Sequence, residues 1–314
     1  MDINNGIKIA EAFVSPIEKL ITTVSAGIGK VYEPTHIKRI SNAIRDNIDI
    51  PIVYNDGKVS INSENFQELA QRASSRMAFQ ELTKQQNIDN IVYNAREELK
   101  NIKNVSEEPV DKDWVFRFFN SVENISNEDL QKIWGRILAG EIKTPNSYSY
   151  RALEVLKNMT PKEIEVFQKF ISICVTDEYY YFISSNQEIL KKYNLDFTDL
   201  LLLEECGLLS VQSLSCTHQI NDEKRSFIKN DSFLSFISTN KKEIKEISFS
   251  IYILNKTGIQ LLNAISTKRE SEYVIDFLKI LAKDNKDIDF TVHKIKNINE
   301  NNEIIYEAKN LLDK

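Results

Sequence analysis

The sequence is poor in the residues that build metal clusters, disulfide frameworks and sharp turns. Its 314 residues include three cysteines, three histidines, eight glycines and six prolines. The cysteines are Cys174, Cys206 and Cys216, which is an odd number. All three lie in or beside apolar runs, and no two of them form a Cys-x-x-Cys pair. Disulfide frameworks need paired cysteines and zinc fingers need closely spaced ones, so the sequence indicates neither. We interpret all three as reduced core residues.

Long apolar runs are missing as well. The first five residues contain no basic segment followed by an apolar one, and no run approaches the roughly 18 apolar residues of a membrane-spanning helix. We therefore expect a cytoplasmic protein that is neither secreted nor inserted into a membrane. The formal net charge of -6 does not match a phosphate backbone, so nucleic-acid binding would need a local basic patch.

The apolar residues that are present follow helical spacing over much of the chain. Hydrophobic residues make up 42% of the sequence and charged residues 27%, which is enough for a core in two or three packed units. The pattern predicts a mainly α (α+β) fold with four regions. These are 1–108 (helical, with a small hairpin at Asn55-Asp56-Gly57), 109–175 (a central helical bundle), 176–270 (a winged-helix-like α/β unit) and 271–314 (a helix and strand extension).

Two helices in the N-terminal region carry apolar stripes. The first stripe, with spacings of three and four, is Phe13, Ile17, Leu20, Ile21, Val24 and Ile28. It could lie on a membrane surface, but nearby Glu11 and Glu18 weaken the basic polar face that such binding needs, so packing within or between chains is the simpler interpretation. The second is a narrow stripe on a long polar helix from Ser63 to about Lys100, which suits a helical hairpin or an oligomer seam.

Two helix starts stand out in the central region. Ser126, followed three residues later by Asp129, resembles a capping box, and Thr160-Pro161-x-Glu163 is a clearer one. Both tryptophans lie in this region. We expect it to be well packed.

The C-terminal half predicts a winged helix. Extended segments at Tyr179–Ile183, Leu208–Leu214 and Ile247–Leu254 alternate with helices, and the polar stretch Thr217–Lys242 reads as a long loop or wing. The helix that would enter a DNA groove, Phe197–Cys206, holds three acidic residues and no basic one, and residues 176–270 contain eleven Lys and Arg against thirteen Asp and Glu. DNA is therefore disfavoured. The better contact element is the wing, with Lys224, Arg225 and Lys229.

No catalytic, cofactor-binding or metal-binding motif is recognisable. Ala26-Gly27-Ile28-Gly29-Lys30 lacks the first glycine, the preceding strand and the final Ser or Thr of a phosphate loop. The histidines His36, His218 and His293 are far apart and could form a joint metal site only through folding. Asp231 with Glu243-Ile244-Lys245 is the nearest approach to a two-metal nuclease, and a solvated face is the simpler interpretation.

One segment is distinctive: residues 130–141 read Leu-Gln-Lys-Ile-Trp-Gly-Arg-Ile-Leu-Ala-Gly-Glu. Together with four other stretches, this segment resembles an uncharacterised bacterial family, the domain-of-unknown-function family 2806. The other stretches are Ser25–Arg39, Arg151–Phe167 with the preceding Pro145, Gly207-Leu208-Leu209 and Leu254–Gly258. Where that family usually has Thr, this chain has Asn255, which could cap the next helix equally well. The resemblance implies a bacterial protein, and looser similarity to abortive-infection proteins implies a phage-defence setting. It supplies no catalytic residues.

Three functions follow as hypotheses. The leading one is a non-enzymatic bacterial interaction protein that self-associates through its long helices and senses or recruits a macromolecular partner, for which a protein is favoured over nucleic acid. The second is a membrane-acting abortive-infection effector that uses the N-terminal helix. The third is a metal-dependent nuclease, although an enzyme is unsupported by any motif.

Overall fold

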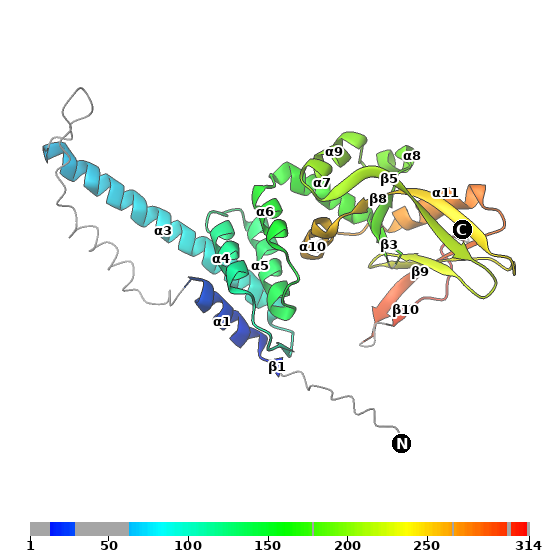
Figure 1. The fold of residues 1–314 in the computed structure, drawn as a ribbon, viewed down its shortest axis with the longest axis horizontal. Coiled ribbons are helices and arrows are strands. Elements are labelled where there is room, and N and C mark those ends of the chain that lie inside the picture. Colours follow the sequence, from blue (N-terminus) through cyan, green and yellow to red (C-terminus); the bar gives the residue numbers. More distant parts are fainter. Residues whose placement is uncertain (1–12, 29–62, 178, 266, 300–302, 313–314) are drawn as a thin grey trace, which may run out of the picture. The chain divides into compact units, whose positions relative to one another are not determined.

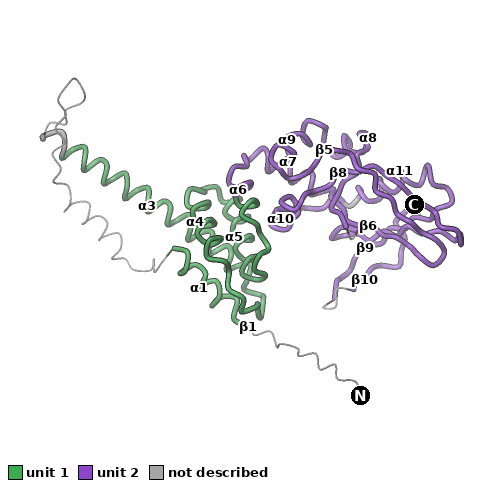
Figure 2. Tube along the Cα trace, viewed as in Figure 1, with its two compact units in different colours: residues 1–153 green, residues 154–314 purple. Residues whose placement is uncertain are grey.

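The computed structural model describes residues 13–28, 63–177, 179–265, 267–299 and 303–312 (Figure 1). The chain divides into two compact units, Met1–Leu153 and Glu154–Lys314, which Figure 2 draws in green and purple. Within the described ranges, no helix is both long and apolar enough to cross a membrane. The predicted hairpin at Asn55-Asp56-Gly57 lies outside the described residues.

The first unit is helical. Its elements are α1 (Pro16–Ile28), α3 (Ser63–Leu99), α4 (Lys112–Val122), α5 (Glu128–Lys143) and the start of α6 (Tyr150–Asn158). A short antiparallel pair, β1 (Phe13–Val14) with β2 (Val105–Ser106), joins the segment before α1 to the segment after α3. Lys19 strengthens this junction, because its Nζ donates to the carbonyl of Ser106 at 2.9 Å.

The long helix is confirmed as α3, but only its C-terminal half packs in the unit. Ile88, Ile91, Ala95 and Leu99 are buried, and α5 lies along this part of the helix (Figure 1). These positions repeat at intervals of three and four, the spacing of a helix face that meets another helix. Between residues 67 and 86 no residue is buried.

Helix starts are set by the side chains that precede them. Thr160 and Glu163 form the predicted capping box at the start of α7 (Pro161–Ile173). At α5, however, the cap is Asn127 instead of the predicted Ser126, because the Asn127 side chain accepts from Leu130 N. Both arrangements satisfy backbone N–H groups that have no partner within the helix.

The second unit is built on one antiparallel sheet of eight strands, in the order β10-β9-β7-β6-β3-β4-β8-β5. The strands are β3 (Val175–Thr176), β4 (Tyr181–Ser184), β5 (Leu209–Ile220), β6 (Ser226–Lys229), β7 (Phe233–Ser238), β8 (Lys245–Leu254), β9 (Asp289–Ile298) and β10 (Ile304–Tyr306). The helices are α7, α8 (Gln187–Lys192), α9 (Phe197–Glu205), α10 (Lys256–Ala264) and α11 (Ser271–Asp284). An aromatic core joins sheet and helix, since Phe277 of α11 packs on Phe182 and Phe249.

The predicted mainly α class with a central helical bundle is wrong. In the first unit, α4 and α5 pack on α1 and α3, so the stretch 109–175 forms no bundle of its own, and α7 lies in the second unit. The predicted winged-helix-like unit is also wrong, because its strands belong to a larger sheet that includes β9 and β10. The predicted loop Thr217–Lys242 holds the end of β5 and all of β6 and β7.

Strand pairing between distant segments explains this error. β6 and β7 are four and six residues long, and serines interrupt their apolar residues, which makes the stretch look like a loop. Once paired, those strands place Ile228, Phe233 and Ile237 in the core. Strand formation depends on cross-strand neighbours more than on intrinsic preference, so a single sequence indicates it weakly.

Candidate functional site

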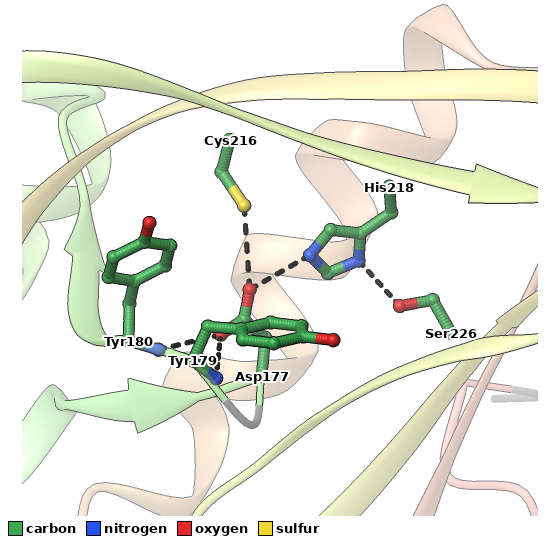
Figure 3. A network of polar contacts seen from close by, with 6 residues as sticks. All are labelled: Asp177, Tyr179, Tyr180, Cys216, His218 and Ser226. Atoms are coloured by element: carbon green, nitrogen blue, oxygen red, sulfur yellow. Dashed lines mark hydrogen bonds and ion pairs between the residues drawn. The ribbon is translucent and has the colours of Figure 1, made fainter.

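Four polar side chains, from two strands and from the residue after a third, meet inside the second unit (Figure 3). Asp177 follows β3 directly, and Ser226 is the first residue of β6. Cys216 and His218 are two residues apart on β5, so they point to the same face of the sheet. In the strand order β5 is separated from β3 by β4 and β8, which means that the sheet curls to bring these side chains together. We call Asp177, Cys216, His218 and Ser226 the polar cluster.

Asp177 is the centre of the cluster. Its Oδ1 accepts hydrogen bonds from the backbone N–H groups of Tyr179 and Tyr180, at 3.1 and 2.9 Å. Its Oδ2 lies 3.0 Å from His218 Nε2 and accepts from Cys216 Sγ at 3.5 Å. The two backbone bonds fix the orientation of the carboxylate, so that Oδ2 faces the two side chains of β5 (Figure 3).

The second nitrogen of His218 is also engaged, because Nδ1 lies 2.7 Å from Ser226 Oγ. The ring packs edge-on against Phe249, with 5.2 Å between the ring centroids. Asp177 is 6% exposed, and Cys216 and His218 are each 9% exposed. The cluster is therefore an ordered polar network in apolar surroundings, where electrostatic interactions are strong.

Burial and hydrogen bonding act in opposite directions on the acidic groups. Burial works to raise the pKa of Asp177, but hydrogen bonds from His218 and from the backbone of Tyr180 and Tyr179 hold that pKa below its ordinary value. Burial and the nearby Asp177 carboxylate raise the pKa of the Cys216 thiol to about 12. Cys216 is thus a protonated thiol that donates to a carboxylate.

The cluster offers two kinds of chemistry. Ser226, His218 and Asp177 have the connectivity of a nucleophile, base and carboxylate. Acyl transfer also needs N–H donors that stabilise an oxyanion. The backbone N–H groups of Tyr179 and Tyr180 lie next to the cluster, but both already donate to Asp177, so they do not serve as such donors here. The second possibility is metal binding, since the ligand atoms of Asp177, Cys216 and His218 lie within 4.8 Å of one another.

The predicted contact residues lie on another surface of the same unit. Lys224 and Arg225 are exposed in the turn between β5 and β6, and Lys229 ends β6, partly exposed. The guanidinium of Arg225 lies over the ring of Phe236, 4.1 Å from its centroid. Phe236 in turn contacts the rings of His293 and Tyr306, at 5.9 and 5.5 Å.

Strand register places these residues on one face of the sheet. Phe227 pairs with Phe236, and Leu234 pairs with both Lys229 and His293, and directly paired residues point to the same side. The opposite side is covered, because α11 packs on β7 and β9 there. We call six residues of this side and its adjoining turn the outer face: Arg225, which is exposed, and Phe227, Lys229, Phe236, His293 and Tyr306, which are partly exposed.

The N-terminal stripe is divided between core and surface. Leu20 and Val24 are buried in the first unit, Ile17 and Ile28 are partly exposed, and Ile21 is 60% exposed. Phe13 lies in β1, paired with Ser106. Ala26, Gly27 and Ile28 of the phosphate-loop-like string lie within α1, where Gly27 allows close packing on Val115 and Phe119. Gly29 and Lys30 lie outside the described residues.

The other sequence candidates have separate surroundings. His293 hydrogen-bonds the carbonyl of Glu307 and lies on the outer face, and His36 is outside the described residues. Asp231 pairs with Arg269 at 2.9 Å, whereas Lys245 begins β8 opposite Ile220. In the predicted groove-entering helix, now α9, Leu200 and Leu203 are core residues.

The distinctive Trp-Gly-Arg segment is a packing motif on α5. Trp134 is fully buried, and a Cβ on Gly135 would lie 2.5 Å from Asn94 Cβ, so the glycine permits the close approach of α5 to α3. Gly140 leaves room for the ring of Tyr148. Glu141 accepts from the backbone N–H groups of Asn146 and Tyr148, at 2.7 and 2.9 Å. The motif therefore joins two helices and one loop.

Comparison with known families agrees with this segment. A family model described as a protein of unknown function, DUF2806, matches residues 71–278. The chain belongs to the DUF2806 family. No curated protein and no solved structure matches the chain. The DUF2806 match includes the whole polar cluster and the β6 and β7 part of the outer face, but ends before β9 and β10.

Sequence reasoning missed the polar cluster in this DUF2806 member. The available signal was Cys216-x-His218-x-Ile220, an alternation typical of a strand with one buried face. The sequence pattern predicts a strand that ends at Leu214, whereas β5 continues to Ile220. Asp177 lies 39 residues from Cys216, so no local spacing points to it.

Proposed function

We propose that this DUF2806 member is a non-enzymatic interaction protein that self-associates through the N-terminal half of α3. The observation that supports it is the stretch from residue 67 to residue 86, where none of the residues is buried. Phe79 is 71% exposed and Leu82 53%. Helices in proteins gain most of their stability from packing, so a stretch of more than five turns with exposed aromatic and aliphatic groups requires a partner helix.

A second copy of the chain is the occupant that we propose. Homo-oligomers mostly use twofold interfaces in which one surface meets itself. An antiparallel pairing centred between Arg76 and Met77 aligns the exposed stretch of one copy with the same stretch of the second. The same centre is the middle of residues 67–86, so this register covers the whole exposed stretch on both chains.

Sedimentation velocity at micromolar concentration tests the assembly. We expect the full chain to sediment as a dimer or larger, and the double variant Phe79→Ser, Leu82→Ser to sediment as a monomer whose circular dichroism loses no more helix than residues 67–86 contribute. Phe116→Ser is a matched control, because Phe116 is also an exposed aromatic, on α4. A monomeric wild type, or a double variant that assembles like the wild type, contradicts the proposal.

The outer face is the surface that we propose for the recruited protein. Arg and aromatic side chains are enriched at protein interfaces and carry much of their binding energy. Here Arg225 is already held against Phe236, so little side-chain entropy remains to be lost on binding. Lys229 and the exposed Lys224 favour an acidic partner.

Proximity labelling in the native host tests this surface. The expected result is a protein labelled by the wild type and not by the variant Arg225→Glu, Lys229→Glu. Lys162→Glu, an exposed charge reversal on α7, should label like the wild type. Identical labelling by all three chains would remove the outer face from the proposal.

The cellular setting is a further part of the proposal. We propose phage defence, with this chain as a recruiting component, because the family resemblance implies a looser similarity to abortive-infection proteins. Phage plating efficiency on cells with and without the gene measures it directly. Equal plating of a broad phage panel would contradict that setting and leave the assembly test unaffected.

A further inference from the structure

Three side chains of the polar cluster converge on one point from two parts of the second unit. Asp177 Oδ2, the Cys216 thiol and a ring nitrogen of His218 lie within 4.8 Å of one another. Zinc bonds of about 2.0 to 2.3 Å in tetrahedral geometry place neighbouring ligand atoms about 3.3 to 3.8 Å apart. The distances from Asp177 Oδ2 to His218 Nε2 and to Cys216 Sγ are 3.0 and 3.5 Å. A small separation of the side chains would therefore admit an ion.

Hydrogen bonds orient His218 and Asp177 in the way that metal ligands require. A ligating histidine almost always engages its other nitrogen in a hydrogen bond, which fixes its tautomer and its orientation. Here Nδ1 of His218 lies 2.7 Å from Ser226 Oγ, so Nε2 can carry the free electron pair. Asp177 is oriented in the same way, because the backbone of Tyr179 and Tyr180 occupies its other oxygen.

We propose that Asp177, Cys216 and His218 bind one zinc-class divalent cation. One oxygen, one sulfur and one nitrogen ligand favour Zn²⁺, and Co²⁺ as its spectroscopic substitute, over Mg²⁺ or Ca²⁺, which take oxygen ligands. Three protein ligands leave a fourth position for water or another small ligand. This site is separate from α3 and from the outer face, so it stands independently of the proposed assembly.

Binding involves two exchanges of bonds. The S–H bond of Cys216 breaks, its proton leaves to solvent, and a metal–sulfur bond forms. At His218 the N–H bond of Nε2, which donates to Asp177, breaks and its proton leaves to solvent, while Nδ1 takes up a proton and donates to Ser226 Oγ, so that Nε2 bonds the metal. The Cys216 thiolate and the Asp177 carboxylate together balance the two charges of the ion, and His218 remains neutral. The buried site is thus left without net charge, which avoids the cost of an unpaired charge in apolar surroundings.

The thiol distinguishes this site from a purely structural hydrogen-bond network. An S–H group is a weak donor, and a contact of 3.5 Å to Asp177 contributes little to holding a buried carboxylate. As a metal ligand the same sulfur would contribute one of the strongest bonds in the site. The ion would also join β5 to the turn after β3 across the intervening strands β4 and β8, so binding should stabilise the second unit.

Metal titration of the full chain, stripped by a chelator, tests the site. We expect Zn²⁺ to bind with a stoichiometry of one per chain and to raise the melting temperature. X-ray absorption of the zinc-loaded wild type should show one sulfur neighbour at about 2.3 Å together with nitrogen and oxygen. Co²⁺ should give a thiolate-to-cobalt charge-transfer band.

Variants separate the site from adventitious binding. Cys216→Ser should lose the charge-transfer band, whereas Cys206→Ser, a control at the end of α9, should keep it. Ser226→Ala removes only the partner of the second ring nitrogen of His218 and should weaken zinc binding about 10- to 100-fold. Absence of stoichiometric uptake, no sulfur neighbour in the wild type, or a band that survives in Cys216→Ser would overturn the proposal.

Discussion

Glu141 accepts a hydrogen bond from the backbone N–H of Tyr148 at 2.9 Å, which pins the loop after α5 to the helix that precedes it. The other carboxylate oxygen accepts from Asn146 N at 2.7 Å. Trp114 holds the same loop from α4, because its Nε1 donates to the Tyr148 carbonyl at 2.7 Å. The Trp-Gly-Arg segment that carries the family resemblance thus ends in a loop anchor within the first unit.

Glu141→Gln tests this anchor. The amide keeps only one of the two oxygens that accept from the loop backbone, and its NH₂ group faces a backbone N–H instead of accepting from it. A buried donor without an acceptor costs about 1 to 3 kcal/mol, so we expect a loss of that size in the free energy of unfolding, measured with urea. Lys143→Ala, an exposed change at the end of the same helix, should alter stability by less than about 0.5 kcal/mol. Equal stability of both variants would contradict the anchor.

Gly135→Ala tests the close contact between α5 and α3. In an exposed helix this substitution stabilises by up to about 1 kcal/mol. Here the new Cβ would lie 2.5 Å from Asn94 Cβ and 3.0 Å from the backbone nitrogen of Ala95. We therefore expect destabilisation of about 1 to 3 kcal/mol from overpacking. A rise in melting temperature would show that the helices separate at little cost.

The sequence predicts correctly those elements of the fold whose sequence signals lie within one short segment. The long helix α3 and the Thr160 capping box were predictable, because their signals lie within one segment. The eight-stranded sheet was not, since its interrupted strands become recognisable only through partners such as Phe227 and Phe236. The polar cluster was missed for the same reason, because pairing and curling of the sheet bring Asp177 to Cys216 and His218.

Asp276 gives a pH-dependent prediction. Burial works to raise the pKa of Asp276, but hydrogen bonds from Lys192 and Tyr193 lower it below the ordinary value of 3.8. Tyr193 Oη donates to Asp276 Oδ2 at 2.6 Å. Because the folded-state pKa is the lower one, the carboxylate contributes stability above its unfolded-state pKa, and this contribution is lost as pH falls through the folded-state pKa.

Asp276→Asn should therefore destabilise the chain at pH 7 by about 1.5 kcal/mol, the usual size for a hydrogen bond to a charged group. The difference from wild type should shrink as the pH falls below 3.8. Urea unfolding at several pH values measures both quantities. A difference that stays constant across this range would show that the charge of Asp276 contributes nothing.

Asn255 forms two bonds at the start of α10, and two substitutions separate them. Its Oδ1 accepts from Gly258 N at 3.0 Å, as an N-cap does, and its Nδ2 donates to the carbonyl of Gly207 at 2.8 Å. Asn255→Thr keeps an oxygen for the cap and loses the bond to Gly207, so we expect a cost of about 1 kcal/mol or less. Asn255→Ala loses both bonds and should cost about 1 to 2 kcal/mol more than the threonine variant. If the two variants unfold at the same urea concentration, the cap contributes nothing to α10. The helix start is then held by the backbone bond from Asn255 N to the Leu208 carbonyl and by the packing of Gly258 against that carbonyl.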